Sequence, residues 1–457
     1  MDLSQYSLLD DFRLTAHWWL PSRPEDKVPG TLTFNPDAGA RQELMGLFNS
    51  PDFGTFALLS SPRSLRLDIV LGSDADADLY TLHILDALNI SNTSTFRVSY
   101  LLAGKHFSST EEINFRSALV QYTYLEAWSC FQFTRPRKSD SPECLSIDIP
   151  STVATLFAAN PGGLIKEVSL EAYARSQFKP SVVDIRPGAR FKIELSAASD
   201  LRAFLALLFD LGQLMTMFVG NPSYVKKLGL FDQSESAVIV FFSSTIRPEE
   251  QLHPLQMCFP LKDIHSSIRI LVEKWFESVP LLKPIHDLLF GTLFAQDSFV
   301  TTKFLSLTQA LESFHRRTTG GTYVDSADYL ALQRTLTAAV PASIPNPLRQ
   351  RLSDTLTYAN EYSLRKRLND LFASLDVRTV DMLKIPDLKS MVELIVKTRN
   401  YLTHFDEESR TLLVDDIVRM HYMNVRLTAL QFILILKRLG IGEAVAASGV
   451  VKRRYFE

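Results

Sequence analysis

The spacing of hydrophobic residues changes once along this chain, and the change restricts the folds that are open to it. Up to about residue 150, short apolar stretches such as "GTLTFN", "SLRLDIVLG" and "STFRVSYLLAG" alternate with turn-forming segments. From about residue 260 onward, apolar residues recur every three or four positions instead. The first spacing is typical of antiparallel strands, and the second is typical of amphipathic helices. An all-β or an all-α fold is therefore excluded.

Within this pattern the sequence predicts three consecutive regions and an α+β class. Residues 1–160 are expected to form a β-rich domain with an antiparallel, sandwich-like sheet. Residues 161–270 are expected to continue it as an α+β segment. The elements predicted there are strands at 182–188, 190–196 and 237–242 and an apolar helix that opens at Ser199 and Asp200. Residues 271–457 are expected to form an antiparallel helical bundle.

Composition indicates a soluble globular protein, with 46% hydrophobic and 22% charged residues. The most apolar stretch, residues 201–219, contains Arg202 and Asp210, which predicts a buried helix rather than a membrane span. The acidic N-terminus lacks the pattern of a signal peptide. The chain has three cysteines, Cys130, Cys144 and Cys258. Their spacing is not that of a disulfide framework or a zinc site. We therefore expect a cytoplasmic protein that needs no membrane, metal or cofactor.

Charge is distributed unevenly along the chain. Residues 281–457 carry 23 lysines and arginines against 19 acidic residues, whereas the preceding part carries 25 against 32. Because polyanions are attracted to positive charge, the helical region is the better candidate for meeting one. Its positive excess is smaller than that of a typical nucleic-acid-binding domain. The imbalance suggests the hypothesis that the acidic N-terminal region shields the basic bundle until a trigger arrives.

The segment "VKTRNYLTHFDEE", residues 396–408, contains the residues that we expect to carry chemistry. It closes a helix that should begin after an Asp387 N-cap. The predicted core stripe of this helix consists of Leu388, Met391, Ile395, Thr398 and Leu402. A second, polar column consists of Glu393, Lys397, Asn400 and His404, and Arg399 lies between the two.

Arg399 and His404 are five residues apart, so they lie about 140° apart around a regular helix. Either the helix ends near Thr403 and turns the histidine back, or the two residues act on a substrate together with a second copy of the chain. The second option suits RNA cleavage by the 2′-hydroxyl, which needs a base, an acid and positive charge beside the phosphate. Histidine transfers protons near neutral pH, and arginine binds phosphate oxygens. A symmetric dimer would supply two of each.

An Arg-x4-His pattern also arises by chance, since cations are favoured near the C-terminus of any helix. The surrounding sequence makes the pattern more specific. Residues 399–404 resemble the motif of HEPN ribonucleases, in which an arginine and a polar residue precede a histidine. "FLSLTQALESFHRR" (304–317) and the long final helix, from about Leu413 to Leu439, resemble the Apea-like HEPN family. Residues 17–48 resemble the β-rich N-terminal domain that accompanies this HEPN domain in ApeA-type bacterial proteins.

This resemblance implies a dimeric, metal-independent endoribonuclease in which Arg399, Asn400 and His404 form a catalytic site shared between two HEPN domains. It also implies a role in abortive-infection defence against phage, with RNA as the substrate and the anticodon loop of tRNA as the expected target. An exposed loop can adopt an in-line geometry that a stacked helix prevents. A phage-derived trigger would then act on the N-terminal region.

Two further features and two other functions stay open. Glu312 would be a supporting residue that orients Arg399, although an ordinary ion pair within its helix explains it equally well. The basic run at residues 364–367 could hold RNA phosphates, but a solvated helix face is the simpler interpretation. The chain could also be a catalytically silent HEPN protein that binds or dimerises, or a sensor that acts through its β-rich region. Loss of toxicity in a His404→Ala variant would distinguish the nuclease from both.

Overall fold

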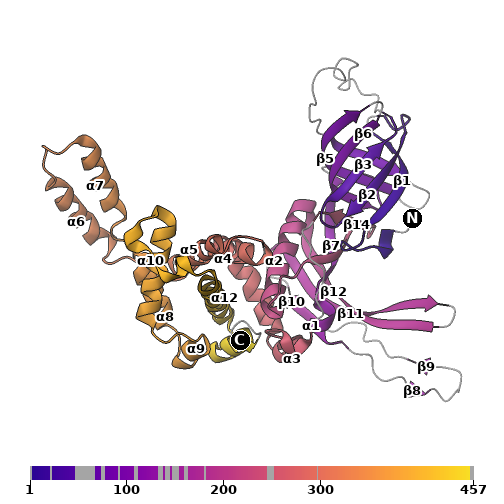
Figure 1. The fold of residues 1–457 in the computed structure, drawn as a ribbon. Helices are drawn as coiled ribbons and strands as arrows, with labels where there is room; N and C mark the ends of the chain where they lie inside the picture. Colours follow the sequence, from indigo (N-terminus) through magenta and orange to yellow (C-terminus); the bar gives the residue numbers. More distant parts are fainter. Residues whose placement is uncertain are drawn as a thin grey trace. The chain divides into compact units, whose positions relative to one another are not determined.

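The computed structural model describes residues 3–20, 23–46, 67–73, 78–90, 93–107, 112–131, 137–138, 145–146, 154–158, 163–179, 182–243, 252–295 and 297–452. The chain divides into two compact units, Met1–Glu273 and Lys274–Glu457 (Figure 1). The boundary predicted between residues 160 and 161 lies outside the described residues, so the subdivision of the N-terminal region stays a prediction.

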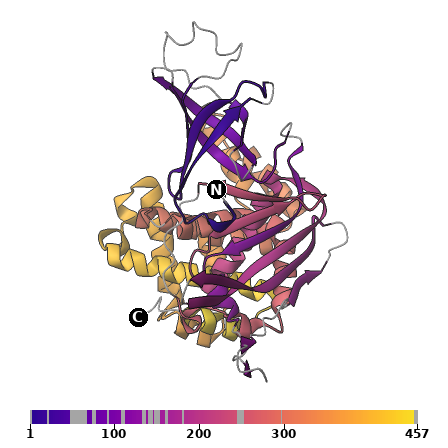
Figure 2. The same cartoon turned by 90° about the vertical axis from the view of Figure 1, so that its right-hand side faces the viewer.

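Unit 1 is built on an antiparallel sheet, which confirms the predicted β-rich region (Figure 2). Within the described residues the sheet contains β1 (Phe12–Trp19), β2 (Val28–Asn35), β3 (Gly39–Leu44), β4 (Leu67–Ser73), β5 (Asp78–Ile90), β6 (Thr93–Ala103), β7 (Asn114–Tyr122), β10 (Ala154–Ala158), β11 (Ile165–Lys179), β12 (Val182–Asp200), β13 (Val225–Phe231) and β14 (Ala237–Phe242). A separate pair is formed by β8 (Arg137–Lys138) and β9 (Leu145–Ser146).

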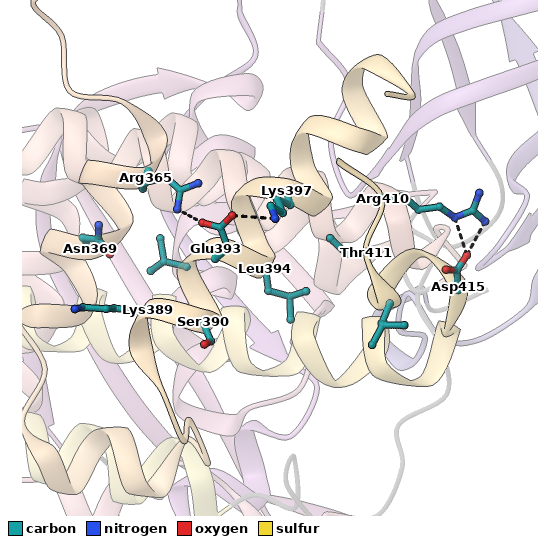
Figure 3. A pocket seen from close by; sticks show the side chains of 12 residues that line it. Arg365, Asn369, Lys389, Ser390, Glu393, Leu394, Lys397, Arg410, Thr411 and Asp415 are labelled. Carbon is teal, nitrogen blue, oxygen red and sulfur yellow. Dashed lines mark hydrogen bonds and ion pairs between the residues drawn. The ribbon is translucent and has the colours of Figure 1, made fainter. Parts of the chain in front are cut away.

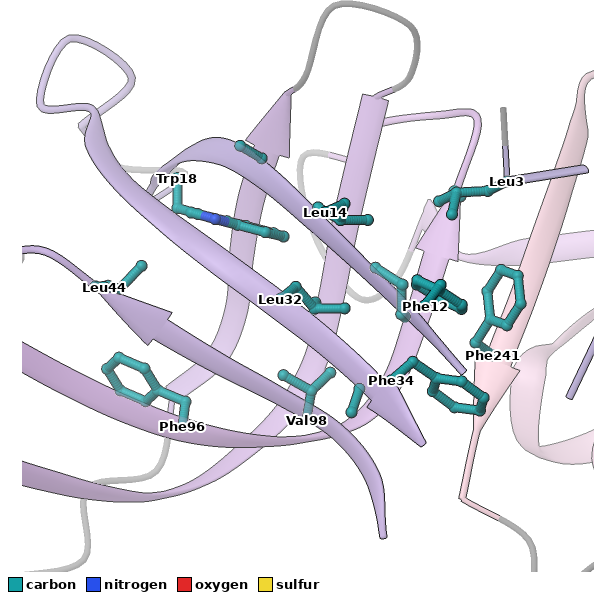
Figure 4. Packing of buried hydrophobic residues seen from close by; sticks show 14 of the residues in the cluster. Leu3, Phe12, Leu14, Trp18, Leu32, Phe34, Leu44, Phe96, Val98 and Phe241 are labelled. Carbon is teal, nitrogen blue, oxygen red and sulfur yellow. The ribbon is translucent and has the colours of Figure 1, made fainter. Parts of the chain in front are cut away.

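Six strands of this sheet close into a ring. Their order is β6-β3-β2-β1-β4-β5, and the last strand, β5, also pairs with the first, β6. This part of the sheet therefore closes on itself. Alternate residues of β1 are buried from Phe12 to Trp18, as expected for a strand with one apolar face. They pack with residues such as Leu32, Phe34 and Phe96 into one apolar core (Figure 4). Closure removes sheet edges that would otherwise pair with other chains.

Strand β12 corrects the prediction of two short strands at 182–188 and 190–196. Proline and glycine often interrupt strands, but β11 and β12 pair continuously across Pro187 and Gly188. A Cβ atom on Gly188 would lie only 2.4 Å from the ring of Tyr173 on β11. Glycine therefore lets that ring pack across the strand, and the ring fills the space that a side chain would take.

Helix α2 (Leu201–Val219) is the predicted apolar helix. The side chain of Asp200 caps it by accepting a hydrogen bond from the N–H of Ala203 at 2.7 Å. The helix is long and apolar enough to cross a membrane, yet 67% of its most apolar window is buried inside the protein. It is held to the sheet by Tyr122, whose hydroxyl donates a hydrogen bond to the carbonyl of Leu208 at 2.6 Å. Unit 1 also contains two short helices, α1 (Leu125–Ser129) and α3 (Leu261–Ile264).

Unit 2 is the predicted all-α region. Its helices are α4 (Ile268–Phe294, which begins before the division), α5 (Val300–Thr318), α6 (Ser326–Ala338), α7 (Asn346–Tyr358), α8 (Leu364–Ala373), α9 (Val377–Met382), α10 (Leu388–His404), α11 (Leu412–Asp415), α12 (Ile417–Leu439) and α13 (Glu443–Lys452). The final long helix predicted from Leu413 is interrupted at Asp416. The Asp416 side chain accepts hydrogen bonds from two N–H groups of the first turn of α12, so α12 begins after this residue.

Side-chain amides on α12 fix it against α5. The Nδ2 of Asn424 donates to the carbonyl of Val300, and the Nε2 of Gln431 donates to the carbonyl of Leu307, each at 2.8 Å. These bonds satisfy one N–H of each amide, whereas the two amide oxygens are buried without a hydrogen-bond partner among the described residues. The two helices therefore have one defined register, on which the rest of the unit is packed.

His286 on α4 is a buried histidine in unit 2. Its ring stacks on Trp275 with centroids 4.4 Å apart, and neither ring nitrogen has a hydrogen-bond partner among the described residues. Burial lowers the pKa of His286 from 6.5 to about 3. Between these values the unfolded chain binds a proton that the folded chain does not. The free energy of unfolding must therefore fall as the pH drops from about 6.5 towards 3.

We expect His286→Phe to keep the stacking and to remove this pH dependence. We compare the free energy of unfolding of the variant with that of the wild type at each pH. This difference should be about 2 kcal/mol more favourable to the variant at pH 5 than at pH 7.5. Unfolding of both proteins by denaturant at the two pH values measures the difference. A variant whose stability differs from the wild type equally at both values would contradict the assignment.

Candidate active site

Helix α10 carries Arg399, Asn400 and His404. Asp387 caps its first turn by accepting a hydrogen bond from the N–H of Ser390 at 2.8 Å, as the sequence predicts. The helix includes His404 and ends at Phe405, which has a left-handed φ of 54°. His404 therefore keeps its helical position. The option in which an earlier helix end turns the histidine back is not what the structure shows.

The buried face of α10 is rotated slightly from the predicted stripe. Its fully buried residues are Val392, Ile395, Val396, Thr398 and Tyr401, whereas Leu388, Met391 and Leu402 are half-buried. The hydroxyls of Thr398 and Thr411 lie 2.7 Å apart, so this buried polar group has a hydrogen-bond partner. The predicted polar column stays outside the core, which leaves Asn400 and His404 on the accessible side.

The side chains of the motif are open to a ligand. Arg399 is half-buried, and its Nη1 donates a hydrogen bond to Asn400 Oδ1 at 3.3 Å. No carboxylate of the described residues lies within ion-pair distance of Arg399. His404 is exposed, and its ring has no partner in the described part of the chain. The guanidinium therefore retains N–H donors, and the imidazole retains both nitrogens, for a substrate.

Glu312 on α5 contacts another arginine. Its carboxylate pairs with Arg316 one turn later at 3.6 Å, and Arg316 also pairs with Glu361 at 2.7 Å. The ion pair within the helix, which the sequence left open, is thus present. Within one protomer the described residues show no ion pair between Glu312 and Arg399. The role of Glu312 in orienting Arg399 therefore stays a prediction.

A buried polar cluster near Glu312 was not predicted from the sequence. Arg367 and His315 are each 1% exposed, and Arg367 Nη1 lies 3.2 Å from His315 Nδ1. Because arginine only donates, Nδ1 must accept, and the ring proton is on Nε2, which lies 3.3 Å from Asp370 Oδ2. Burial, followed by the charge of Arg367, lowers the pKa of His315, so the ring stays neutral. The cluster joins α5 to α8 and has a structural role.

The basic run at residues 364–367 is consequently not a uniform solvated face. Arg367 belongs to the buried cluster, Lys366 pairs with Asp370, and Arg365 pairs with Glu393 on α10. The Lys366 pair is a local contact between residues four apart, whereas the partners of Arg365 and Arg367 lie in other parts of the chain, and no local pattern distinguishes these two arginines. Only Arg365 remains on the surface that also holds the polar column of α10.

Two family models match the chain. Residues 13–275 match ApeA N-terminal domain 1, and residues 305–444 match the Apea-like HEPN domain. The second match includes Arg399, Asn400 and His404 as well as Glu312. No curated protein and no solved structure matches the chain significantly.

Proposed function

The chain belongs to the ApeA-type proteins, an anti-phage family with a HEPN domain, and from this premise we propose that its helical unit is an endoribonuclease. Arg399, Asn400 and His404 would be the catalytic residues, and a second copy of the chain would complete the site. One observation carries the proposal. His404, whose ring has no partner among the described residues, and Arg399, which has no carboxylate partner among them, lie about 140° apart on one continuous helix within the HEPN match.

The proposed reaction is cleavage of RNA by its own 2′-hydroxyl. One histidine removes the hydroxyl proton while the 2′-oxygen bonds to phosphorus. The bond from phosphorus to the 5′-oxygen breaks, and the second histidine protonates that oxygen. The products are a 2′,3′-cyclic phosphate and a 5′-hydroxyl. Every proton transfer is assigned to a side chain, so the scheme requires no metal ion.

The arginines would stabilise the charge that develops on the phosphate. A guanidinium can donate two parallel hydrogen bonds to the non-bridging oxygens, which gain negative charge in the transition state. The amide oxygen of Asn400 holds one edge of Arg399 and so limits its orientation. Asn400 is therefore proposed to position the arginine.

The surface next to His404 supports a second copy as the partner. Large apolar side chains are 42 to 70% exposed on the segment that follows α10, and they are Phe405, Leu412, Ile417, Val418 and Tyr422. Val418 and Tyr422 lie on one side of α12, because residues four apart are neighbours on a helix, and Ile417 comes just before them in its first turn. Exposed apolar groups of this kind mark protein interfaces. A two-fold axis at this surface would bring two copies of His404 together.

We further propose that the substrate is tRNA, cut in its anticodon loop, and that a phage-derived component acts on the N-terminal unit as the trigger. The unpaired nucleotides of a loop can reach the in-line geometry of the proposed reaction. The positive excess of residues 281–457 favours a polyanionic substrate, and the negative excess of the remainder fits a region that restrains it.

Incubation of the purified full-length protein with unfractionated tRNA and EDTA tests this proposal. We expect cleavage that leaves 2′,3′-cyclic phosphate ends, and we expect it to increase when lysate from phage-infected cells is added. Lysate from uninfected cells is the control. A protein that binds tRNA but leaves it intact under all these conditions would instead support a catalytically silent HEPN domain.

A further inference from the structure

A groove of about 920 Å³ lies on the accessible side of α10 (Figure 3). It is bounded by α8, by the first half of α10 and by residues 410–415. Four cationic side chains line it, and they are Arg365, Lys389, Lys397 and Arg410. Two carboxylates, those of Glu393 and Asp415, also line it, so the groove carries a net positive charge.

We propose that this groove binds the sugar–phosphate backbone of the RNA on one side of the cut. The inference rests on the proposed ribonuclease function and names the path by which its substrate reaches His404. The polar column of α10 connects the two places, since Glu393 and Lys397 line the groove and Asn400 and His404 continue the column.

The length of this path favours an extended strand over a free nucleotide. Lys397 and His404 are seven residues apart, so they lie on the same side of α10, about 10 Å apart along its axis. Lys389 lies about 12 Å farther towards the N-terminus of the helix. One nucleotide cannot contact both lysines and also present its phosphate to His404, whereas successive phosphates of a strand can.

Ion pairs hold two of the cations in place without neutralising the groove. Glu393 binds Arg365 through one carboxylate oxygen and Lys397 through the other, the latter at 3.3 Å. The hydrogen bonds from Arg365 and Lys397 lower the pKa of Glu393, so two cations share one negative charge. Lys389 is exposed and forms no ion pair among the described residues, although the Asp387 carboxylate is near enough to interact with its charge. Phosphates should therefore meet Lys389 and the pair of Arg365 and Lys397.

Arg410 contributes less to the attraction. Its Nε and Nη2 both donate to Asp415 Oδ1, at 3.1 and 2.6 Å, and its Nη1 lies 3.3 Å from a carboxylate oxygen of Glu407. These contacts raise the pKa of Arg410 and satisfy most of its donors. Arg410 thus closes one end of the groove, and the RNA would be bound at the other cations.

Two substitutions with opposite expected effects test the inference. In the full-length His404→Ala protein, which should not cut RNA, Lys389→Ala should weaken binding of a labelled single-stranded oligoribonucleotide by a factor on the order of five. It should also reduce the slope of log K against log salt concentration by about 0.7. Glu393→Gln should tighten binding several-fold, and loss of folding cannot produce a gain. Arg334→Ala removes an exposed cation from α6 and serves as the matched control, with no change expected.

Two results would overturn the groove as an RNA site. One is that Lys389→Ala and Glu393→Gln bind the oligoribonucleotide like Arg334→Ala. The other is that the two substitutions change the affinity for AMP but leave the affinity for the oligoribonucleotide unchanged, which would identify a nucleotide pocket. If the wild type cleaves tRNA and either result is found, the groove fails while the ribonuclease stands. If binding shifts as expected but no cleavage occurs, the ribonuclease fails while the groove stands.

Discussion

Replacing His404 by alanine is expected to reduce tRNA cleavage by about 100-fold or more, because a positioned proton-transfer group contributes about 10² to 10⁴ to a rate. Arg399→Ala should have an effect of similar size, since loss of one donor to the developing negative charge costs about 10² to 10³. The readout is the initial rate of tRNA cleavage in EDTA. Arg399→Lys should restore only part of the loss, because lysine keeps the charge but lacks the planar fork.

These variants should differ from the wild type in chemistry and not in folding. His404 is exposed and its ring has no partner in the described part of the chain, so its removal should change the free energy of unfolding by less than about 0.5 kcal/mol. His265→Ala, at an exposed histidine in unit 1, is the matched control and should keep full activity. Full activity in the His404→Ala protein would contradict the assignment of His404 to a catalytic site.

Placing a charge in the exposed apolar surface should separate the two copies. Ile417 is 66% exposed in one protomer, and we propose that the second copy buries it. A buried, unpaired carboxylate is costly, so Ile417→Glu should prevent dimerisation. Because one protomer holds only one His404, the monomer should lose cleavage to about the same extent as His404→Ala, by about 100-fold or more.

Light scattering and tRNA cleavage on the same sample measure both consequences. Val377→Glu is the matched control, since Val377 on α9 is 79% exposed and lies outside the proposed interface. It should remain dimeric and active. An Ile417→Glu protein that is monomeric and fully active would show that a second copy is unnecessary.

Those parts of the molecule that depend on neighbouring residues were predictable from the sequence. The Asp387 cap and the polar column of α10 follow from the order of residues within one helix, and both are present. The apolar helix after Asp200 is equally local. The antiparallel sheet and the helical unit follow from the spacing of hydrophobic residues alone.

Features that depend on distant contacts were not predictable in this way. The ring of strands in unit 1 requires β1 to pair with β4 and β3 to pair with β6, and these strands are not neighbours in sequence. Arg367 looks like its basic neighbours in sequence, but it is buried because His315 lies beside it from 52 residues away. Gly188 suggests an interruption until Tyr173 is placed against it. The proposed site belongs to the same class, because one chain does not contain all of it.

A heterodimer of one wild-type chain and one His404→Ala chain tests the shared site most directly. Two different affinity tags allow it to be purified, and its cleavage of tRNA can be compared with that of both homodimers. If the two histidines act on one phosphate as base and acid, the heterodimer should be as inactive as the His404→Ala homodimer. About half of the wild-type activity would mean that each protomer cuts alone, and it would contradict the shared site.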